Sequence, residues 1–373
     1  TDRPEFYSTT GSFVFSQRNA EQQFREVVED SGDSPFKFPT LRTATPADFE
    51  EAADKDAILR ELAEWNASTI VKLPLLKARA ADLRDIVKEF SSSFLLFSPH
   101  VGSLRLEDRI GAGRSREIET KLENSSNGKI SPGKNEDKWN ATIVLKEGEK
   151  SDRWMVSTSF CTPTAVSRAD AGPLAPQDPE EEWRVPITWA VPEIVGRQRG
   201  EFWAFFSTDS ETTLSGILNA PWKTNVDRTY IHKAGIEALD TAGNTLNGQL
   251  VHAAAALVID SIPLLQEFWP DDCCRFLIAL PGRFTGAEVL NWADGLLGRR
   301  IYEVGKESKS LPDQTGALQM PTALHLHPDV DDKAVDEWVK FENRPTRWVH
   351  PDVQSTGREK KPKARRLMSP DTS

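Results

Sequence analysis

Arg228 is the residue whose type and setting point most directly to chemistry. It stands in the stretch GILNAPWKTNVDRTYI, residues 216–231, just past a Pro-Trp-Lys step where the pattern predicts that a strand ends and a helix begins. A cation at the N-terminal end of a helix faces the positive end of the helix dipole, so local electrostatics gives no reason for it. Its guanidinium fork suits a distant phosphate or carboxylate. The alternative is a surface salt bridge to Asp227 or Glu237, since such pairs are common and weak.

Complete catalytic signatures of the common kinds are missing from the sequence. It has no GxxxxGK[ST], GxSxG, HExxH or CxxC pattern. Zinc is a hypothesis, because His325 and His327 alternate in LHLHP and would share one face of a strand, with His350 as a third ligand. Ordinary polarity on the exposed face of a strand is the interpretation that we favour.

The composition indicates a globular protein that does not bind nucleic acid or anionic membranes through its overall charge. Its 373 residues, 38% of them hydrophobic, suffice for a substantial core and for two or three domains. A net charge of -11 argues against nonspecific binding to nucleic acid or to anionic lipid. The cysteines, Cys161, Cys273 and Cys274, provide neither a disulfide framework nor zinc spacing, so we expect a reducing, cytoplasmic location.

The two ends and the longest apolar run carry further signals. The sequence starts at Thr1 with neither an initiator methionine nor a secretory signal, so we expect further residues upstream. Residues 357–366 hold six basic residues and one acidic residue, which predicts a disordered, solvated tail; nucleic acid would be contacted only through this tail. The run 250–265 is interrupted by a histidine, an aspartate and a proline, so it predicts a buried helix and no membrane span.

Strand and helix signals alternate along the chain and predict an α+β fold. Residues 139–207 predict a mostly antiparallel sheet whose tryptophans belong to the core. Two polar segments, 110–138 and 168–182, are expected to be mobile or poorly packed. The expected strands cover 11–16, 68–75, 101–108, 140–146, 153–161, 183–193 and 200–209. The expected helices cover 45–66, 77–90, 234–269 and 285–304. The tryptophans are Trp139, Trp154, Trp183, Trp189 and Trp203.

Five segments occur in an order that resembles a known family. They are TDRPEFYSTTGSFVFS, STIVKLPLL, FLLFSPHVGSLRLED, FWAFFSTDSETTLSGILNAPWKTNVDRTYI and SLPDQTGALQMP. Through most of residues 1–350 this order is similar to the sacsin-type branch of the GHKL ATPases, relatives of the large heat-shock chaperones. In that family a segment like TDRPEFYS follows the glycine-rich ATP lid.

The resemblance implies a role for Arg228. Thr-Asn-Val-Asp-Arg at 224–228 is similar to the Asn-Val-Ser-Arg step of the chaperone middle domain, whose arginine reaches the ATP γ-phosphate across the domain boundary. Arg228 is then the expected catalytic residue, with Asn225 and Lys223 close to the nucleotide. The implied cofactors are ATP and Mg, and the implied partner is a client or partner protein, with room for a homodimer.

The nucleotide-binding motifs of that family are not found in this sequence. The family holds Mg-ATP with a helix bearing a glutamate and an asparagine, an Asp-x-Gly-x-Gly turn and the lid, all of which would precede the first residue. Glu136 and Asn140 have the spacing of the helix pair but come too late, and Asp108, Gly111 and Gly113 miss the turn pattern by one residue, so both count as coincidence. ATP hydrolysis therefore depends on motifs supplied upstream or by a companion chain.

The resemblance implies four parts and leaves two classes of function open. A partial GHKL-type α/β sandwich (1–75) precedes a transducer-like middle domain with a mixed sheet (76–240), a helical and extended region (241–350) and the basic tail (351–373). One class is the nucleotide-sensing half of a chaperone-like or defence-associated ATPase. The other is a catalytically inactive scaffold that uses its tryptophan-rich sheet and acidic surface to hold other proteins.

Overall fold

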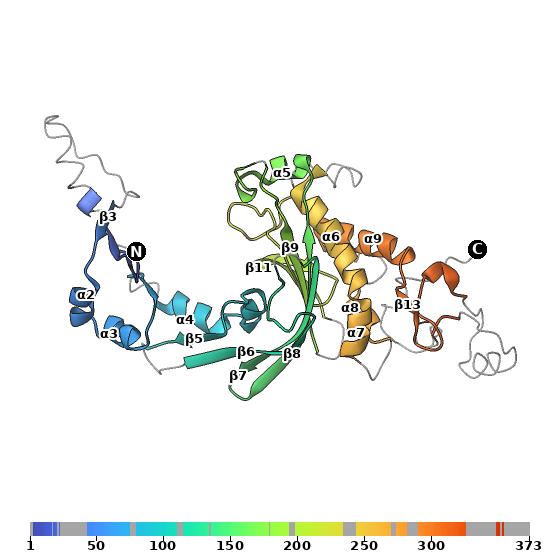
Figure 1. Cartoon of the computed structure of the whole chain (residues 1–373), viewed down its shortest axis with the longest axis horizontal. Helices are drawn as coiled ribbons and strands as arrows, with labels where there is room; N and C mark the ends of the chain where they lie inside the picture. Colours follow the sequence, from blue (N-terminus) through green and yellow to red (C-terminus); the bar gives the residue numbers. More distant parts are fainter. Residues whose placement is uncertain are drawn as a thin grey trace. The chain divides into compact units, whose positions relative to one another are not determined.

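A computed structural model of the chain shows two compact units, Thr1–Phe90 and Ser91–Ser373 (Figure 1). Each unit combines a sheet with helices, and the larger one has a mixed sheet of eight strands, which confirms the predicted α+β class. The structure describes residues 3–16, 18–20, 22, 43–74, 80–109, 115–133, 136–178, 180–193, 198–233, 244–269, 274–281, 290–325, 348–350 and 353.

The N-terminal unit has a four-stranded antiparallel sheet in the order β3-β2-β1-β4. Its core joins Tyr7 and Ile70 on the strands to Leu59 on a helix, so α2 and α3 cover one face of the sheet. The elements are β1 (Glu5–Ser8), β2 (Phe13–Ser16), β3 (Thr43–Pro46), α2 (Phe49–Lys55), α3 (Ala57–Glu64), β4 (Thr69–Lys72) and α4 (Ala80–Glu89).

Two expectations about these helices are corrected. The single helix predicted over 45–66 is two helices, because Asp56 is extended and its carboxylate accepts hydrogen bonds from the backbone N–H groups of Ile58 and Leu59 at the start of α3. Helix α4 forms within the predicted range 77–90, but Leu83 and Ile86, whose helical spacing predicts one inward face, are 43% and 59% exposed.

The C-terminal unit is built on an eight-stranded sheet in the order β11-β10-β12-β9-β8-β7-β6-β5. All neighbours pair antiparallel except β10 and β12, which are parallel, so the sheet is mixed. The strands are β5 (Ser103–Glu107), β6 (Ser115–Ser125), β7 (Lys138–Glu147), β8 (Lys150–Cys161), β9 (Val185–Pro192), β10 (Gly200–Ala204), β11 (Phe206–Thr212) and β12 (Ile217–Asn219).

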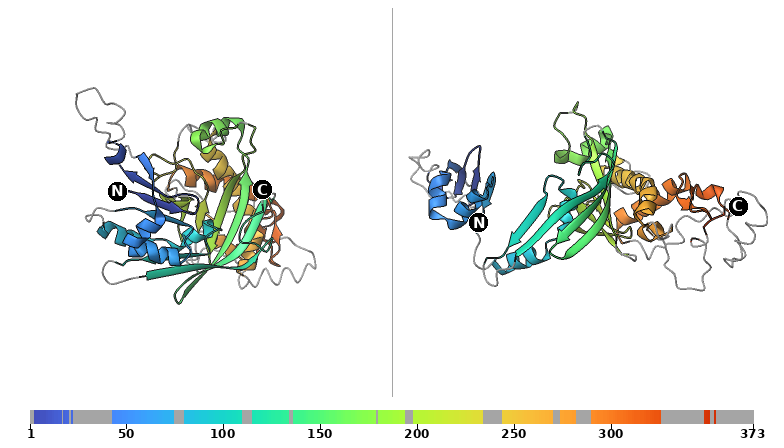
Figure 2. Two further views of the ribbon diagram at one scale, coloured as in Figure 1. Left: turned by 60° about the vertical axis from the view of Figure 1, so that its left-hand side comes forward. Right: turned by 60° about the horizontal axis from the view of Figure 1, so that its bottom comes forward.

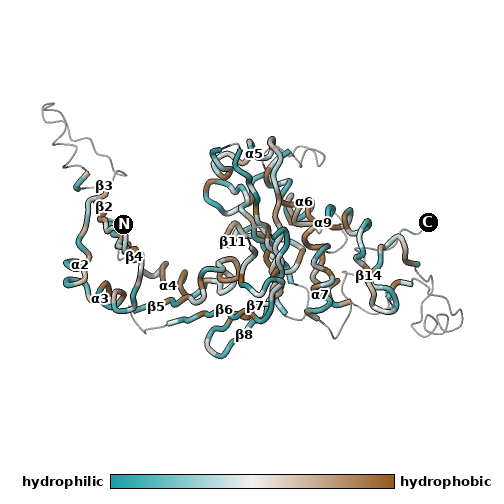
Figure 3. The backbone as a smooth tube through the Cα atoms, in the orientation of Figure 1, coloured by the Kyte–Doolittle hydropathy of each residue, from teal (hydrophilic) through white to brown (hydrophobic). Residues whose placement is uncertain are grey.

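Helices cover one face of this sheet, and the 3-10 turn η2 packs on the other. Helix α6 packs on β8, β9 and α9, and Figures 1 and 2 show α6 and α9 running along the same side of the sheet. In Figure 3 hydrophobic stretches recur along α6 and α7, whereas the turn joining β7 to β8 is hydrophilic. The remaining elements are η2 (Ser92–Phe97), α5 (Ala165–Ala171), η3 (Gly172–Leu174), α6 (Leu246–Asp260), α7 (Ile262–Phe268), α8 (Phe276–Ala279), α9 (Trp292–Lys306), β13 (Leu311–Pro312), β14 (Leu318–Gln319) and η5 (Pro321–Ala323).

The strands are apolar on both faces because each face has a core of its own. Along β9, Trp189 points into the core shared with α6, and its neighbour Ala190 points into the core shared with η2. Trp139 and Trp203 are also buried, which confirms their predicted place in the core. Trp154 and Trp183 are partly buried and pack against the two cores.

Helix α6 lies in the same compact unit as the sheet and packs on it. The division between the two units falls after Phe90, so α4 is part of the N-terminal unit. Among the described residues no single helix is long and apolar enough to cross a membrane, although α6 and α7, bent by 47°, reach that length and composition together.

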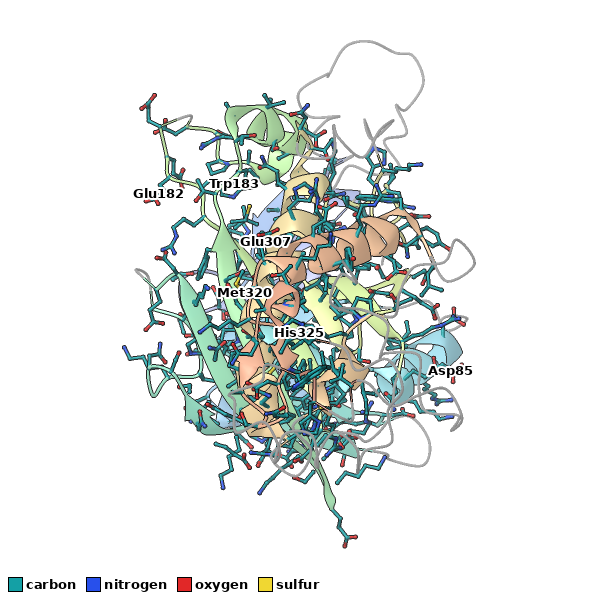
Figure 4. The ribbon with its side chains drawn as sticks, turned by 90° about the vertical axis from the view of Figure 1, so that its right-hand side faces the viewer. Asp85, Glu182, Trp183, Glu307, Met320 and His325 are labelled. Atoms are coloured by element: carbon teal, nitrogen blue, oxygen red, sulfur yellow. The ribbon has the colours of Figure 1, made fainter. Side chains whose placement is uncertain are left out.

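The first polar segment is more ordered than its composition suggests. Residues 115–125 form strand β6 in the middle of the expected loop 110–138. The strand alternates charged, exposed positions with inward ones such as the fully buried Ile118, a period of two that the polar composition masks. In the second segment, 168–182, residues 168–171 belong to α5, and Arg168 donates to the carbonyl oxygens of Asp178 and Glu181. The end of this segment, around Glu182 and Trp183, lies beside α5 in Figure 4.

Candidate functional site

Arg228 lies in a turn and not at the start of a helix. Thr224 and Ile231 pair as an antiparallel bridge, and the residues between them reverse the chain. We call residues 224–231 the arginine turn. The turn closes through Asn225, whose carbonyl oxygen accepts from the Arg228 N–H at 3.0 Å and whose side chain accepts from the Tyr230 N–H at 2.9 Å. Asparagine is suited to this role because its short amide bonds the nearby backbone.

The backbone of Arg228 is in the left-handed region, with φ 61°. A residue with a Cβ atom is disfavoured there by roughly 1–2 kcal/mol, so the hydrogen bonds of the turn must hold Arg228 in this conformation. The side chain is exposed. Within the described part of the chain, its guanidinium has no hydrogen-bond or ion-pair partner.

The salt bridge to Asp227, offered as the alternative, does not form. The Asp227 carboxylate instead accepts from the hydroxyl of Thr229 at 2.8 Å and from its backbone N–H at 3.4 Å. These hydrogen bonds from Thr229 lower the pKa of Asp227. Glu237 lies outside the described residues, as does the helix start expected after the turn. The next described helix begins at Leu246.

The Lys223 side chain is held by hydrogen bonds within the protein, whereas the Arg228 side chain is exposed to solvent. Its ammonium donates to the Asp170 carboxylate at 3.0 Å and to the Asp170 carbonyl oxygen at 2.6 Å, and about a third of its side chain is exposed. Asn225 is likewise engaged, since its Nδ2 donates to the Thr229 hydroxyl at 2.9 Å. The structure therefore brings Lys223, Asn225 and Arg228 together on one loop, with Arg228 directed to solvent and the other two holding the loop.

Asp170 connects three elements at the base of the arginine turn. It lies in α5, binds Lys223, and accepts from the Leu246 N–H at 3.0 Å at the start of α6. Burial raises its pKa, but the hydrogen bonds from Leu246 and Lys223 and the charge of Lys223 outweigh this, so its pKa is lowered. The carboxylate is therefore ionised at neutral pH and fastens α5 to both the turn and α6.

Asn247 is the residue at this site that sequence reasoning missed. It is 3% exposed in the first turn of α6, and its amide side chain bonds the backbone on both sides of the arginine turn, at Lys223 and at His232. The helix-start signal at Thr245, which caps α6 by accepting from the Gly248 N–H, could have located the start of the helix but not these partners.

The histidines considered for zinc are not assembled among the described residues. His325 pairs with Trp348 in a parallel bridge and lies in the extended segment after η5 (Figure 4), whereas His350 Nδ1 is 3.3 Å from the Cys274 Sγ atom. His327 lies outside the described residues. In those residues no three histidine, cysteine or acidic side chains gather as metal ligands.

Glu136 and Asn140 have local structural partners, in keeping with their interpretation as coincidence. Glu136 accepts from the Gly133 N–H at 2.7 Å and from the Asn127 amide at 2.8 Å in the turn before β7. Asn140 lies on β7 and accepts from the Ser157 hydroxyl at 2.6 Å. Neither lies on a helix.

Comparison of the chain with models of known protein families, with curated proteins and with solved structures finds no match.

Proposed function

We propose that this chain is the nucleotide-sensing part of a sacsin-like, chaperone-type GHKL ATPase, with Arg228 contacting the γ-phosphate of ATP. The nucleotide itself, with Mg, is held by motifs that lie before this chain or in a companion chain. The arginine stabilises the charge that develops on the transferred phosphoryl group, as an arginine finger does. Hydrolysis is thereby sensed by the unit that carries the arginine turn.

The observation that carries the proposal is an unpaired, exposed arginine held in a strained backbone conformation. An arginine on a surface turn ordinarily finds a carboxylate or lies along the surface, and a strained position is ordinarily occupied by glycine or asparagine. Here Asp227 is bound to Thr229, so the neighbouring carboxylate does not neutralise Arg228. An arginine presented in this way is suited to an anion that arrives from outside the chain.

Steady-state ATP turnover tests the proposal in the ATPase that carries this chain together with the nucleotide-binding motifs. We expect Arg228→Ala to lower kcat by about 10³-fold and to leave KM nearly unchanged. Arg228→Lys should recover little, because an ammonium lacks the planar fork. Val226→Ser is the matched control, since Val226 is fully exposed in the same turn and should tolerate the change. Unchanged turnover in Arg228→Ala would remove Arg228 from the mechanism.

A protein-binding scaffold is the second candidate, and an exposed aromatic group favours it. Three of the sheet tryptophans cannot provide the surface, because Trp139, Trp189 and Trp203 are buried. Phe205 and Phe206 are instead 46% and 52% exposed at the turn between β10 and β11.

The two candidates predict different mutant patterns. A scaffold predicts that Phe206→Ser weakens binding to the partner protein in a titration, and that Arg228→Ala changes neither this binding nor ATP turnover. The nucleotide sensor predicts that Arg228→Ala lowers ATP turnover and that Phe206→Ser leaves turnover unchanged.

A further inference from the structure

The arginine turn needs an external support to present Arg228 in one direction. Its own hydrogen bonds run between residues within the turn, such as Asn225 and Tyr230, and these fix its shape but not its orientation. Its attachment to β11 consists of the Asp209 N–H donating to the Thr229 carbonyl at 2.7 Å and the Ile231 N–H donating to the Ser210 hydroxyl at 3.2 Å.

The Trp292 indole N–H also donates to the Ile231 carbonyl oxygen at 3.3 Å, and Asp170 holds the Lys223 ammonium at 3.0 Å. Asn247 makes more hydrogen bonds to the ends of the turn than either of these residues. Its Oδ1 accepts from the Lys223 N–H at 2.8 Å, and its Nδ2 donates to the carbonyl oxygens of Lys223 at 2.7 Å and of His232 at 2.9 Å. Lys223 directly precedes the turn and His232 directly follows it, so one amide side chain holds both of its ends. The amide is used as acceptor and as double donor, a pattern that neither aspartate nor leucine, a side chain of similar size, can reproduce.

The anchor behind Asn247 is rigid. Helix α6 is buried along most of its length, and residues such as Leu250, Val251 and Ala254 are fully buried between the sheet and α9. A buried, hydrogen-bonded side chain on such a helix has little freedom, because both its rotamer and its partners are fixed. The position of the turn is therefore tied to the position of α6.

We infer that Asn247 is the positioning residue of the proposed phosphate sensor: it fixes where Arg228 is presented and couples the arginine turn to α6. The inference rests on the proposed function for its link to ATP. The hydrogen bonds of the Asn247 side chain to Lys223 and His232, which we call the clasp, are a property of this chain. A displacement of about 1 Å at a charge-stabilising group can cost about 100-fold in rate, so the clasp is expected to act on kcat. A movement of the turn on phosphate contact would pass directly to α6.

Hydrogen exchange on this chain tests the clasp without ATP. We expect Asn247→Ala to speed exchange of the Lys223 amide by about tenfold or more, because that N–H loses its acceptor. Gln249→Ala is the matched control, since Gln249 lies two residues along α6 and bonds Thr164 instead. It should leave the Lys223 amide protected. Equal protection of this amide in Asn247→Ala and in the parent overturns the clasp, whatever Arg228 does.

Epistasis in the intact ATPase tests the positioning role. We expect Asn247→Ala to lower kcat by about 100-fold with KM for ATP little changed, and to have almost no further effect in an Arg228→Ala background. A purely structural role would lower turnover by the same factor in both backgrounds and would overturn the inference. If Arg228→Ala alone leaves turnover unchanged, the proposed function fails, and the exchange result still decides the clasp.

Discussion

Replacing Arg228 by glycine separates the conformational strain of the arginine turn, measured by stability, from the role of the guanidinium, measured by ATP turnover. At φ 61° the arginine backbone is disfavoured by roughly 1–2 kcal/mol relative to an unstrained residue, and glycine removes this penalty. Glycine also loses more chain entropy on folding, by roughly 0.5–1 kcal/mol. The difference predicts that Arg228→Gly changes the free energy of unfolding by between about 0 and 1.5 kcal/mol in the stabilising direction.

Arg228→Ala is the reference for this prediction, because it removes the same guanidinium and keeps the strain. Alanine gains nothing from the left-handed backbone, so the glycine variant should be more stable than the alanine variant by about 1 kcal/mol. For the unit Ser91–Ser373, that difference corresponds to about 2 °C in melting temperature. In the intact ATPase both variants should lose turnover equally, since neither has a guanidinium.

Thermal and urea unfolding of the two variants, with ATP turnover measured in parallel, provide the assay. An alanine variant at least as stable as the glycine variant would show that the turn does not hold the left-handed conformation, and the argument from strain would fail. Turnover retained in either variant would refute the role assigned to the guanidinium. A more stable and inactive Arg228→Gly is the pattern expected of a position where stability is traded for function.

Three further perturbations test the packing and electrostatics around the sheet. Gly200→Ala should destabilise strongly, by more than about 2 kcal/mol in urea unfolding, because the new Cβ would lie 2.2 Å from the Gly216 carbonyl oxygen. Asp294→Ala should cost about 2–4 kcal/mol, since a buried carboxylate that accepts several hydrogen bonds would leave donors unpaired; a loss below 1 kcal/mol would contradict this. Burial, and then the charge of Arg300, lower the pKa of His252 below its usual 6.5. The unfolded chain therefore takes up a proton first as the pH falls, and stability should decline below about pH 6.5; His252→Gln should flatten that decline in melts between pH 5 and 7.

Most strands of the sheet can be predicted from the sequence, because they are runs of apolar and β-branched residues. The segments that became β7, β8 and β9 combine apolar and β-branched residues with tryptophan, and such runs bounded by polar turns indicate buried strands. The sequence does not predict strand β6, because the outward positions of this strand are charged and its segment has the composition of a loop. The break at Asp56 was missed because the helical pattern continues across it, and only the capping hydrogen bonds reveal the interruption.

The candidate site was predicted in part. The chemistry of Arg228 singles it out in the sequence, but the local pattern predicts a helix start at a place where Asn225 and Asp227 favour a turn. Asn247 could not be found in this way, since its partners lie 24 and 15 residues earlier in the chain and are backbone groups without a sequence signature. Contacts of this kind are set by tertiary packing.

Affinity for a transition-state analogue tests the contact between Arg228 and the γ-phosphate most directly. In the ATPase that carries this chain with its nucleotide-binding motifs, dissociation constants for ADP and for ADP with aluminium fluoride would be measured in the parent and in Arg228→Ala. An arginine that stabilises the transferred phosphoryl group predicts that the variant binds the analogue about 10³-fold more weakly and ADP within about twofold of the parent. Equal affinity for the analogue in both proteins would contradict the proposal.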